Sequence, residues 1–126
     1  MTWTDATTPL ADIRESLRAF NRERDWGQYH NARNLAMALS VEASELLELY
    51  LWSKDEGPQP ALASRAPRVA DEAADVLICL LNLCDHAGID LAAAVHEKMK
   101  KNAEKYPADL AVGRLEKYDE LSRDRS

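Results

Sequence analysis

The chain has 126 residues, of which 46% are hydrophobic and 30% are charged, and its formal net charge is −6. This composition excludes a disordered chain, and the length fits one domain with a modest core. The acidic charge argues against a nucleic-acid partner bound through a basic face. No apolar run approaches the roughly 20 residues that span a bilayer, and no basic, apolar leader opens the chain. We therefore expect a cytoplasmic protein without a membrane partner.

Apolar side chains recur at helical spacing along the chain, and it carries no period-2 strand pattern. The sequence therefore predicts an all-α, four-helix bundle-like fold. Thr8, Asn31 and Asp90 are the expected N-caps of the first, second and fourth helices. Gly88 is expected to end the third helix and Pro107 to stop the fourth. We expect helices at residues 9–24, 32–52, 67–88 and 91–105.

Two segments are expected to lie outside these helices. Residues 53–66 carry turn chemistry rather than helical periodicity. Residues 108–126 are polar with a weak leucine pattern, which predicts a frayed tail or, alternatively, an arm that packs on a neighbouring subunit. Cys79 and Cys84 lie in one apolar helical segment, at a spacing that fits neither a zinc motif nor a disulfide framework. We expect both to be reduced thiols.

Two acid pairs stand at i,i+3 spacing in apolar, helix-prone segments: Glu42 with Glu45, and Glu72 with Asp75. This spacing places both members of a pair on neighbouring faces of one helical turn. Glu42 falls within the leucine stripe of its helix, where a charge is costly. The alternative is that each acid lies at the edge of its stripe and reaches water. If the helices pack together, four carboxylates without His or Cys favour Mg²⁺ or Mn²⁺ over zinc.

Polar and aromatic side chains near these acids are candidates for substrate contact. Lys98 and Asn102 lie on or beside the apolar face of the fourth helix, and Lys98 could meet phosphate oxygens. Trp26 and His30 precede the second helix, and Trp52 ends it. These aromatics could stack on a planar base, although core packing and a solvated lysine are the alternatives. The chain lacks a glycine-rich phosphate loop, so a phosphate substrate would be held by metal ions and single basic side chains.

The motif Glu42-Ala-Ser-Glu45 followed by Glu72-Ala-Ala-Asp75 resembles the E-x-x-E…E-x-x-D signature of MazG-like, all-α nucleotide pyrophosphohydrolases. The resemblance covers about residues 10–107, and its details are those of the dCTP pyrophosphatase branch. The segments that carry it are Arg24-Asp25-Trp26, His30, Arg33-Asn34-Leu35, Leu51-Trp52, Lys98-Met99, Asn102 and Tyr106-Pro107.

The resemblance implies a Mg²⁺-dependent enzyme that cleaves a (deoxy)nucleoside triphosphate, dCTP or a modified dCTP, to the monophosphate and pyrophosphate. It implies a MazG-like domain over residues 1–107, in a homodimer or homotetramer with the site at a subunit contact. It also assigns roles to ten residues: metal ligation to Glu42, Glu45, Glu72 and Asp75; the base pocket to Trp26, His30 and Trp52; and phosphate or sugar contacts to Lys98, Asn102 and Tyr106.

In such a hydrolysis a water molecule attacks the triphosphate, and either Glu42 or Glu45 acts as the general base that takes its proton. One position departs from the dCTP pyrophosphatase pattern, because Cys79 stands where close relatives tend to carry Tyr. This departure bears on base or sugar preference more than on the chemistry. Two alternatives remain open: hydrolysis of another nucleotide, such as phosphoribosyl-ATP or a broad range of NTPs, and a non-enzymatic metal-binding dimerisation module.

Overall fold

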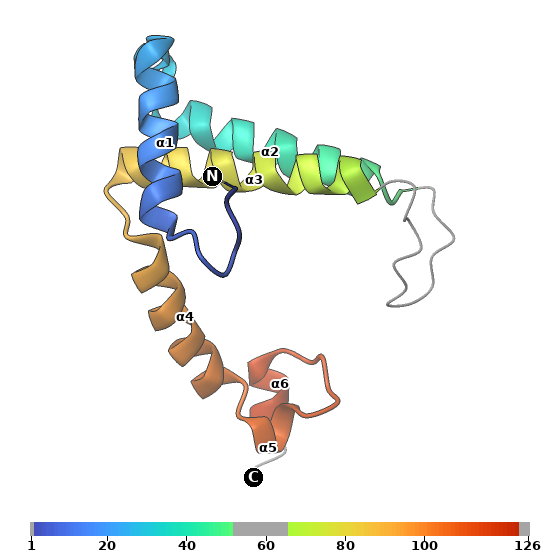
Figure 1. Cartoon of the computed structure of the whole chain (residues 1–126). Helices are drawn as coiled ribbons and strands as arrows, with labels where there is room; N and C mark the ends of the chain where they lie inside the picture. Colours follow the sequence, from blue (N-terminus) through green and yellow to red (C-terminus); the bar gives the residue numbers. More distant parts are fainter. Residues whose placement is uncertain (1, 52–65, 124–126) are drawn as a thin grey trace. The chain divides into compact units, whose positions relative to one another are not determined.

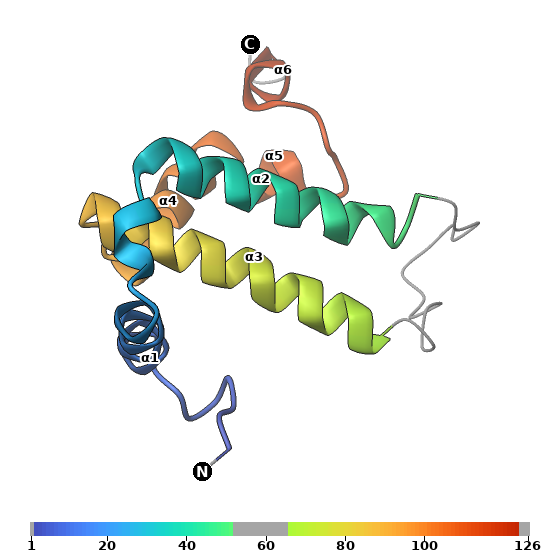
Figure 2. The ribbon, with the colours of Figure 1, turned by 90° about the horizontal axis from the view of Figure 1, so that it is seen from above.

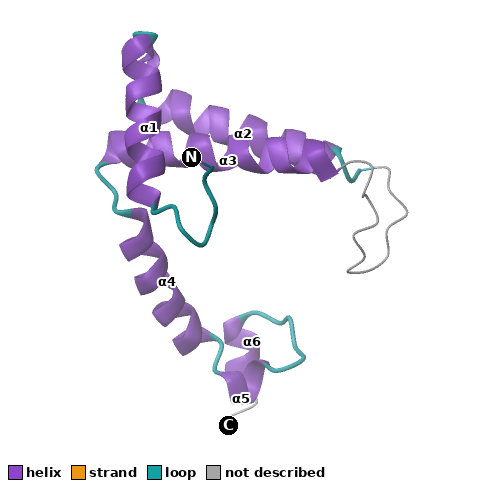
Figure 3. Cartoon of the chain, viewed as in Figure 1, coloured by secondary structure: helices purple, strands orange, loops and turns teal. Residues whose placement is uncertain are grey.

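The computed structural model describes residues 2–51 and 66–123, and within these residues the only regular secondary structure is helical (Figure 3). This confirms the predicted all-α class. The elements, labelled in Figure 1, are α1 (Leu10–Glu23), η1 (Trp26–Tyr29, a 3₁₀ helix), α2 (Ala32–Glu48), α3 (Ala66–Ala87), α4 (Leu91–Lys105), α5 (Ala108–Ala111) and α6 (Tyr118–Ser122).

Three of the predicted helix ends are confirmed by local hydrogen bonds or backbone angles. The Asn31 side chain accepts from the backbone N–H of Asn34 at 2.9 Å and caps α2. Asp90 accepts from the N–H of Ala93 at 3.0 Å and caps α4. Gly88 ends α3 with φ +67°, a left-handed conformation that costs glycine little. Short-range polar chemistry therefore fixes where these helices begin and end.

Two other predicted ends are wrong. Pro9, rather than Thr8, occupies the N-cap position of α1, because its backbone is extended (φ −62°, ψ 149°). The Thr8 hydroxyl instead accepts from the backbone N–H of Thr4 at 3.0 Å. Helix α2 ends at Glu48, several residues before the predicted residue 52. The chain there tightens into i→i+3 hydrogen bonds, such as Leu51 N–H to the Glu48 carbonyl at 3.4 Å.

The chain divides after Ile89 into two compact units. In the first unit α2 and α3 lie side by side and antiparallel (Figure 2), and α1 crosses α3 (Figure 1). Leucines and a cysteine fill the space between these elements, and the most buried are Leu35, Leu49, Leu81 and Cys84. The antiparallel α2–α3 pair brings the two acid motifs together.

The second unit holds α4, α5 and α6, and its most buried side chain is Leu121. Tyr106, at the end of α4, meets Tyr118 edge to face with ring centroids 6.4 Å apart. Residues 108–123 thus form two short helices where the polar sequence favoured a frayed tail. The packing of this segment on a neighbouring subunit stays a prediction.

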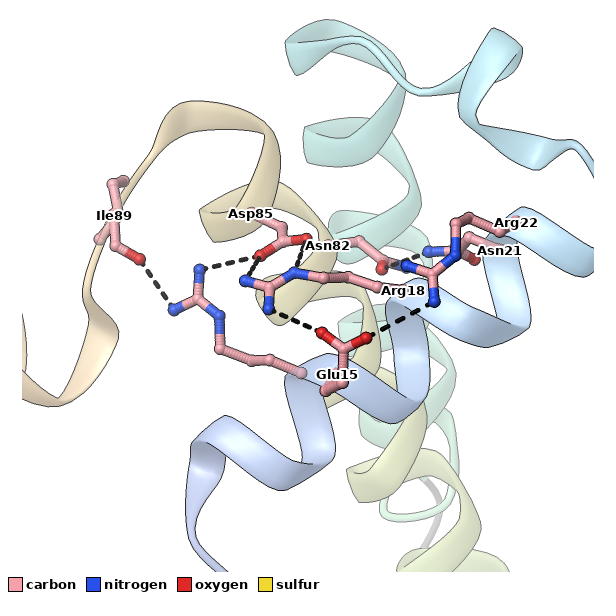
Figure 4. Close-up of polar contacts among 8 residues, drawn as sticks. Glu15, Arg18, Asn21, Arg22, Asn82, Asp85 and Ile89 are labelled. Carbon is pink, nitrogen blue, oxygen red and sulfur yellow. Dashed lines mark hydrogen bonds and ion pairs between the residues drawn. The ribbon is translucent and has the colours of Figure 1, made fainter.

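A polar cluster, here called the α1–α3 clasp, joins Arg14 and Arg18 of α1 to Asp85 of α3. Figure 4 shows Arg18 and Asp85 facing each other. Arg18 donates to both Asp85 oxygens, at 2.6 and 2.8 Å, and Arg14 donates to Asp85 Oδ1 at 3.1 Å. Arg14 also donates to the carbonyl oxygen of Ile89 at 2.8 Å, just beyond the end of α3. These bonds hold the pKa of Asp85 below its usual range, with the Arg18 hydrogen bond the main cause.

Both cysteines are free thiols, Cys84 buried and Cys79 half-buried, as predicted. Among the described residues, no single helix has the length and apolar composition to cross a membrane. Helices α3 and α4 taken together meet these criteria, but a break separates them.

Candidate active site

Three of the four predicted acids meet between α2 and α3. Glu42 and Glu45 come from successive turns of α2, and Glu72 comes from α3. One carboxylate oxygen from each lies within 4.8 Å of the others. Glu42 and Glu72 are half-buried, whereas Glu45 is exposed. We call these three residues the carboxylate cluster.

The cluster is under electrostatic strain without a cation. Burial raises the pKa of Glu42 to about 6, and the neighbouring Glu45 and Asp75 add to the shift. Burial also raises the pKa of Glu72, again with Glu45 and Asp75 contributing. The Oε2 atoms of Glu42 and Glu72 are buried and lack a hydrogen-bond partner within the described residues. Orphaned buried oxygens of this kind need a ligand, because their desolvation is otherwise uncompensated.

Asp75, the fourth predicted acid, lies beside the cluster. Its charge raises the pKa of both Glu42 and Glu72, but none of its oxygens belongs to the group that lies within 4.8 Å. Asp75 is exposed and lines a neighbouring cavity. It therefore connects the carboxylate cluster to the space in which a substrate could lie.

Cys79 stands one turn after Asp75 on α3 and is half-buried. Burial raises the pKa of its thiol, and the charges of Glu42 and Asp75 raise it further. The position at which the sequence departs from the dCTP pyrophosphatase pattern thus borders the cluster itself. The thiol stays protonated there at neutral pH and offers a short, weak donor.

Beside Asp75 is a cavity of about 370 Å³, here called the aromatic cavity, within the size range of small-ligand sites. Trp26, a predicted base-pocket residue, lines it and meets Phe20 edge to face at 5.5 Å between ring centroids. The remaining lining residues come from α1, α3 and the N-terminal segment and are Trp3, Ile13, Ser16, Leu17, Asn21, Asp75, Ile78 and Asn82.

His30 lies elsewhere, in a second pocket of about 300 Å³ whose lining residues are mostly polar or charged. Arg18, Arg22 and His86 share this polar pocket, so the structure does not bring His30 and Trp26 into one cavity. The prediction for Trp52, and that for the loop at residues 53–66, fall outside the described residues. Of the two predicted base-pocket residues that the structure describes, Trp26 lines the aromatic cavity and His30 does not.

The predicted phosphate or sugar contacts belong to the second unit. Lys98 and Asn102 are exposed on α4, and Tyr106 caps its end. The backbone N–H of Tyr106 donates to the Asn102 carbonyl at 2.8 Å. Their contact with a substrate held by the first unit stays a prediction.

Sequence reasoning missed the polar contacts between α1 and α3, in which Asp85 pairs with Arg14 and Arg18, and Asn21 pairs with Asn82. The sequence did contain a sign of the Asp85 pairing. An acid in the last turn of a helix is unfavourable beside the negative end of the helix dipole, and a cationic partner offsets this cost. The asparagines gave no comparable signal, since an amide on a helix carries no charge to balance.

The donor set of the cluster fits a hard divalent cation. Carboxylate oxygens are preferred ligands of Mg²⁺ and Mn²⁺, and the two orphaned oxygens supply unused acceptor capacity. The fold and the site define an all-α protein with an acidic cluster that could hold a cation, beside a cavity with aromatic walls. A family model described as "MazG-like family" matches residues 37–121, and the chain belongs to this family.

Individual proteins similar to this chain are pyrophosphatases. The chain is 45% identical over 114 residues to dCTP pyrophosphatase 1 of Homo sapiens, covering 89% of this chain and 67% of the relative. It is 42% identical over 116 residues to dCTP pyrophosphatase 1 of Rattus norvegicus, covering 90% and 68%. A solved pyrophosphatase from Archaeoglobus fulgidus has the same fold, with a TM-score of 0.74 at 39% identity. That alignment covers 84% of this chain and 99% of the Archaeoglobus chain.

Proposed function

We propose that this protein is a nucleoside triphosphate pyrophosphohydrolase that converts dCTP, or a modified dCTP, to the monophosphate and pyrophosphate. The observation that carries the proposal is the carboxylate cluster, with two orphaned oxygens, beside the aromatic cavity. The names of the relatives support the choice of dCTP. Such an enzyme removes unwanted nucleotides from the deoxynucleotide pool.

Glu42, Glu45 and Glu72 would hold Mg²⁺, with Asp75 completing the set from the same face of α3. A bound Mg²⁺ supplies charge neutralisation for the triphosphate and a lowered pKa for the attacking water. The raised pKa values of Glu42 and Glu72 support this assignment, because a bound cation would offset the burial, and the repulsion from neighbouring acids, that raise them.

The general base is Glu42 or Glu45. Glu45 is the exposed member of the cluster and has direct access to water, whereas Glu42 is half-buried with one orphaned oxygen. This difference favours Glu45 for accepting the proton and Glu42 for holding the cation. Both remain within reach of the same reacting centre.

The base would occupy the aromatic cavity, and the phosphates would extend past Asp75, which lines this cavity, toward the carboxylate cluster and its cation. Trp26 and Phe20 offer ring surfaces for stacking on a planar base. Lys98, Asn102 and Tyr106 would contact phosphate or sugar, as the resemblance to the family implies. Trp52 and His30 would also contact the base, as the resemblance to the family implies; His30 lines the neighbouring polar pocket.

The protein works as a homodimer or homotetramer with the site at a subunit contact. In support, few apolar side chains are buried within the described residues, while many large ones are exposed. Met37 and Val41 lie one turn apart on α2 and are each more than half exposed. A second copy that covers this face would bury it.

The test is a pyrophosphate-release screen over canonical and modified deoxynucleoside triphosphates, with Mg²⁺ and with chelator. We expect release from dCTP with Mg²⁺ and none in chelator. Release from another nucleotide but not from dCTP or its modified forms would overturn the substrate. Mg²⁺-dependent stabilisation without release from any nucleotide would instead identify a non-enzymatic module.

A further inference from the structure

Two carboxamides form a hydrogen-bonded pair in the wall of the aromatic cavity. Asn21 of α1 donates from Nδ2 to Oδ1 of Asn82 of α3 at 3.1 Å, and both side chains are half-buried (Figure 4). Both residues also line the polar pocket, so the pair separates the two cavities. Most of the other residues around the aromatic cavity are apolar, and the pair therefore contributes much of its hydrogen-bonding capacity.

One hydrogen bond uses only part of what two carboxamides offer. Each has two N–H donors and a carbonyl acceptor. With Asn82 Oδ1 accepting from Asn21, the pair still presents N–H donors from Asn82 and the carbonyl oxygen of Asn21. In a largely apolar cavity, a few such groups fix the orientation of a ligand and give specificity.

We propose that the Asn21–Asn82 pair reads the pairing edge of the pyrimidine and makes the site prefer cytosine to uracil. This inference rests on the proposed function, because it takes the aromatic cavity as the base pocket. The N4 amino group of cytosine donates and its N3 accepts, whereas O4 of uracil accepts and its N3–H donates. The Asn82 donor and the Asn21 acceptor complement cytosine. To complement uracil, both carboxamides would have to flip so that each exchanges the positions of its oxygen and nitrogen.

A purely structural pair would only bridge α1 and α3. The substitution Asn82→Asp separates the two roles, because a carboxylate still accepts from Asn21 Nδ2 but has no N–H to donate. The hydrogen bond between α1 and α3 is therefore kept. N3 of cytosine, itself an acceptor, then faces another acceptor, whereas N3–H of uracil gains an acceptor for its proton. Any effect of the added charge on the triphosphate is the same for both nucleotides.

The experiment measures kcat/KM for dCTP and for dUTP, which differ only at the base. We expect the ratio of the two values to fall by about tenfold or more in Asn82→Asp, and to fall also in Asn82→Ala. The matched control is Asp85→Asn, which weakens the clasp between the same two helices without touching the aromatic cavity. This control should lower the melting temperature and leave the ratio unchanged.

An unchanged ratio in folded Asn82→Asp and Asn82→Ala would overturn the inference while leaving the proposed function intact. If these variants are inactive, titration calorimetry measures the dissociation constants of dCMP and dUMP for the wild-type protein and the variants. A fall in the preference for dCMP supports the inference, and an unchanged preference overturns it. Wild-type protein that releases pyrophosphate from no nucleotide would overturn the proposed function and this inference with it.

Discussion

Glu42 and Glu72 differ from ordinary acids on a helix surface in where their oxygens lie. One oxygen of each is buried and lacks a hydrogen-bond partner within the described residues, and burial raises the pKa of each carboxyl. Glu45 contributes a third oxygen within 4.8 Å. Such a group is unfavourable when ionised alone and becomes favourable when it binds a divalent cation.

The raised pKa values predict how the stability of the cation-free protein depends on pH. Because the pKa of these carboxyls is higher in the folded state than in the unfolded state, the folded state binds protons more tightly at these positions. The resulting stability is fully present below the ordinary carboxyl pKa and is lost as pH rises through about 6. Chelated protein should melt at a higher temperature at pH 5 than at pH 7.5, and Mg²⁺ should restore the loss at pH 7.5.

The control for this prediction is the double variant Glu42→Gln/Glu72→Gln, which cannot titrate at these positions. Its melting temperature should change less between pH 5 and pH 7.5, and Mg²⁺ should have little effect on it. Differential scanning calorimetry in chelator measures both proteins. Equal pH dependence in the two would show that these carboxyls are not the groups responsible.

Among the elements, α1 is held to α3 largely by polar contacts, since none of its own residues is fully buried. The clasp joins Arg14 and Arg18 to Asp85, and Arg14 also bonds the Ile89 carbonyl at the end of α3. Side chains of α1 and α3 also line the aromatic cavity, but Arg14, Arg18 and Asp85 are not among its lining residues.

We expect Asp85→Asn to lower the free energy of unfolding by about 1–2 kcal/mol at pH 7, because Arg14 then lacks its carboxylate partner. The lowered pKa of Asp85 means that its contribution is present above the ordinary carboxyl pKa and is lost in acid. Urea denaturation measures the change. The exposed acid Asp71 on α3 provides the control, and equal losses in Asp85→Asn and Asp71→Asn would contradict the role of the clasp.

Local chemistry made much of the fold predictable from sequence. Asn31, Gly88 and Asp90 act on backbone groups within a few residues, so their roles are visible in the sequence itself. Apolar periodicity likewise placed Glu42 and Glu72 on or beside the apolar stripes of their helices, although the packing of α2 against α3 is known only from the structure. The Asn21–Asn82 pair joins residues 61 positions apart, and no local pattern reports which side chains will meet across such a distance.

The described part of the chain exposes many large apolar side chains, and several of them lie on α2. Met37 and Val41 are 56% and 54% exposed, and Leu47 of the same helix is 58% exposed. Leaving such groups in water costs roughly 25 cal/mol per Å² of apolar area. Association of identical copies is the simplest way to recover this free energy.

The double substitution Met37→Glu/Val41→Glu should therefore shift the protein toward monomer and lower its melting temperature. Light scattering coupled to size-exclusion chromatography measures the molar mass over a range of concentrations. Lys101→Glu, at an exposed position of α4, changes the net charge by the same amount and serves as the control. A wild-type mass equal to that of one chain at all concentrations would contradict the proposed oligomer.

The central claim is that the carboxylate cluster holds the cation on which hydrolysis depends. Its most direct test is ³¹P NMR of dCTP incubated with Mg²⁺ and wild-type, Glu42→Gln, Glu72→Gln or Glu48→Gln protein. Glu48 is an exposed acid of α2 outside the cluster, so its variant controls for the loss of a carboxylate. Wild-type and Glu48→Gln protein should yield dCMP and pyrophosphate, and the two cluster variants should be slower by about 100-fold or more. Near-normal hydrolysis by both Glu42→Gln and Glu72→Gln would contradict the account.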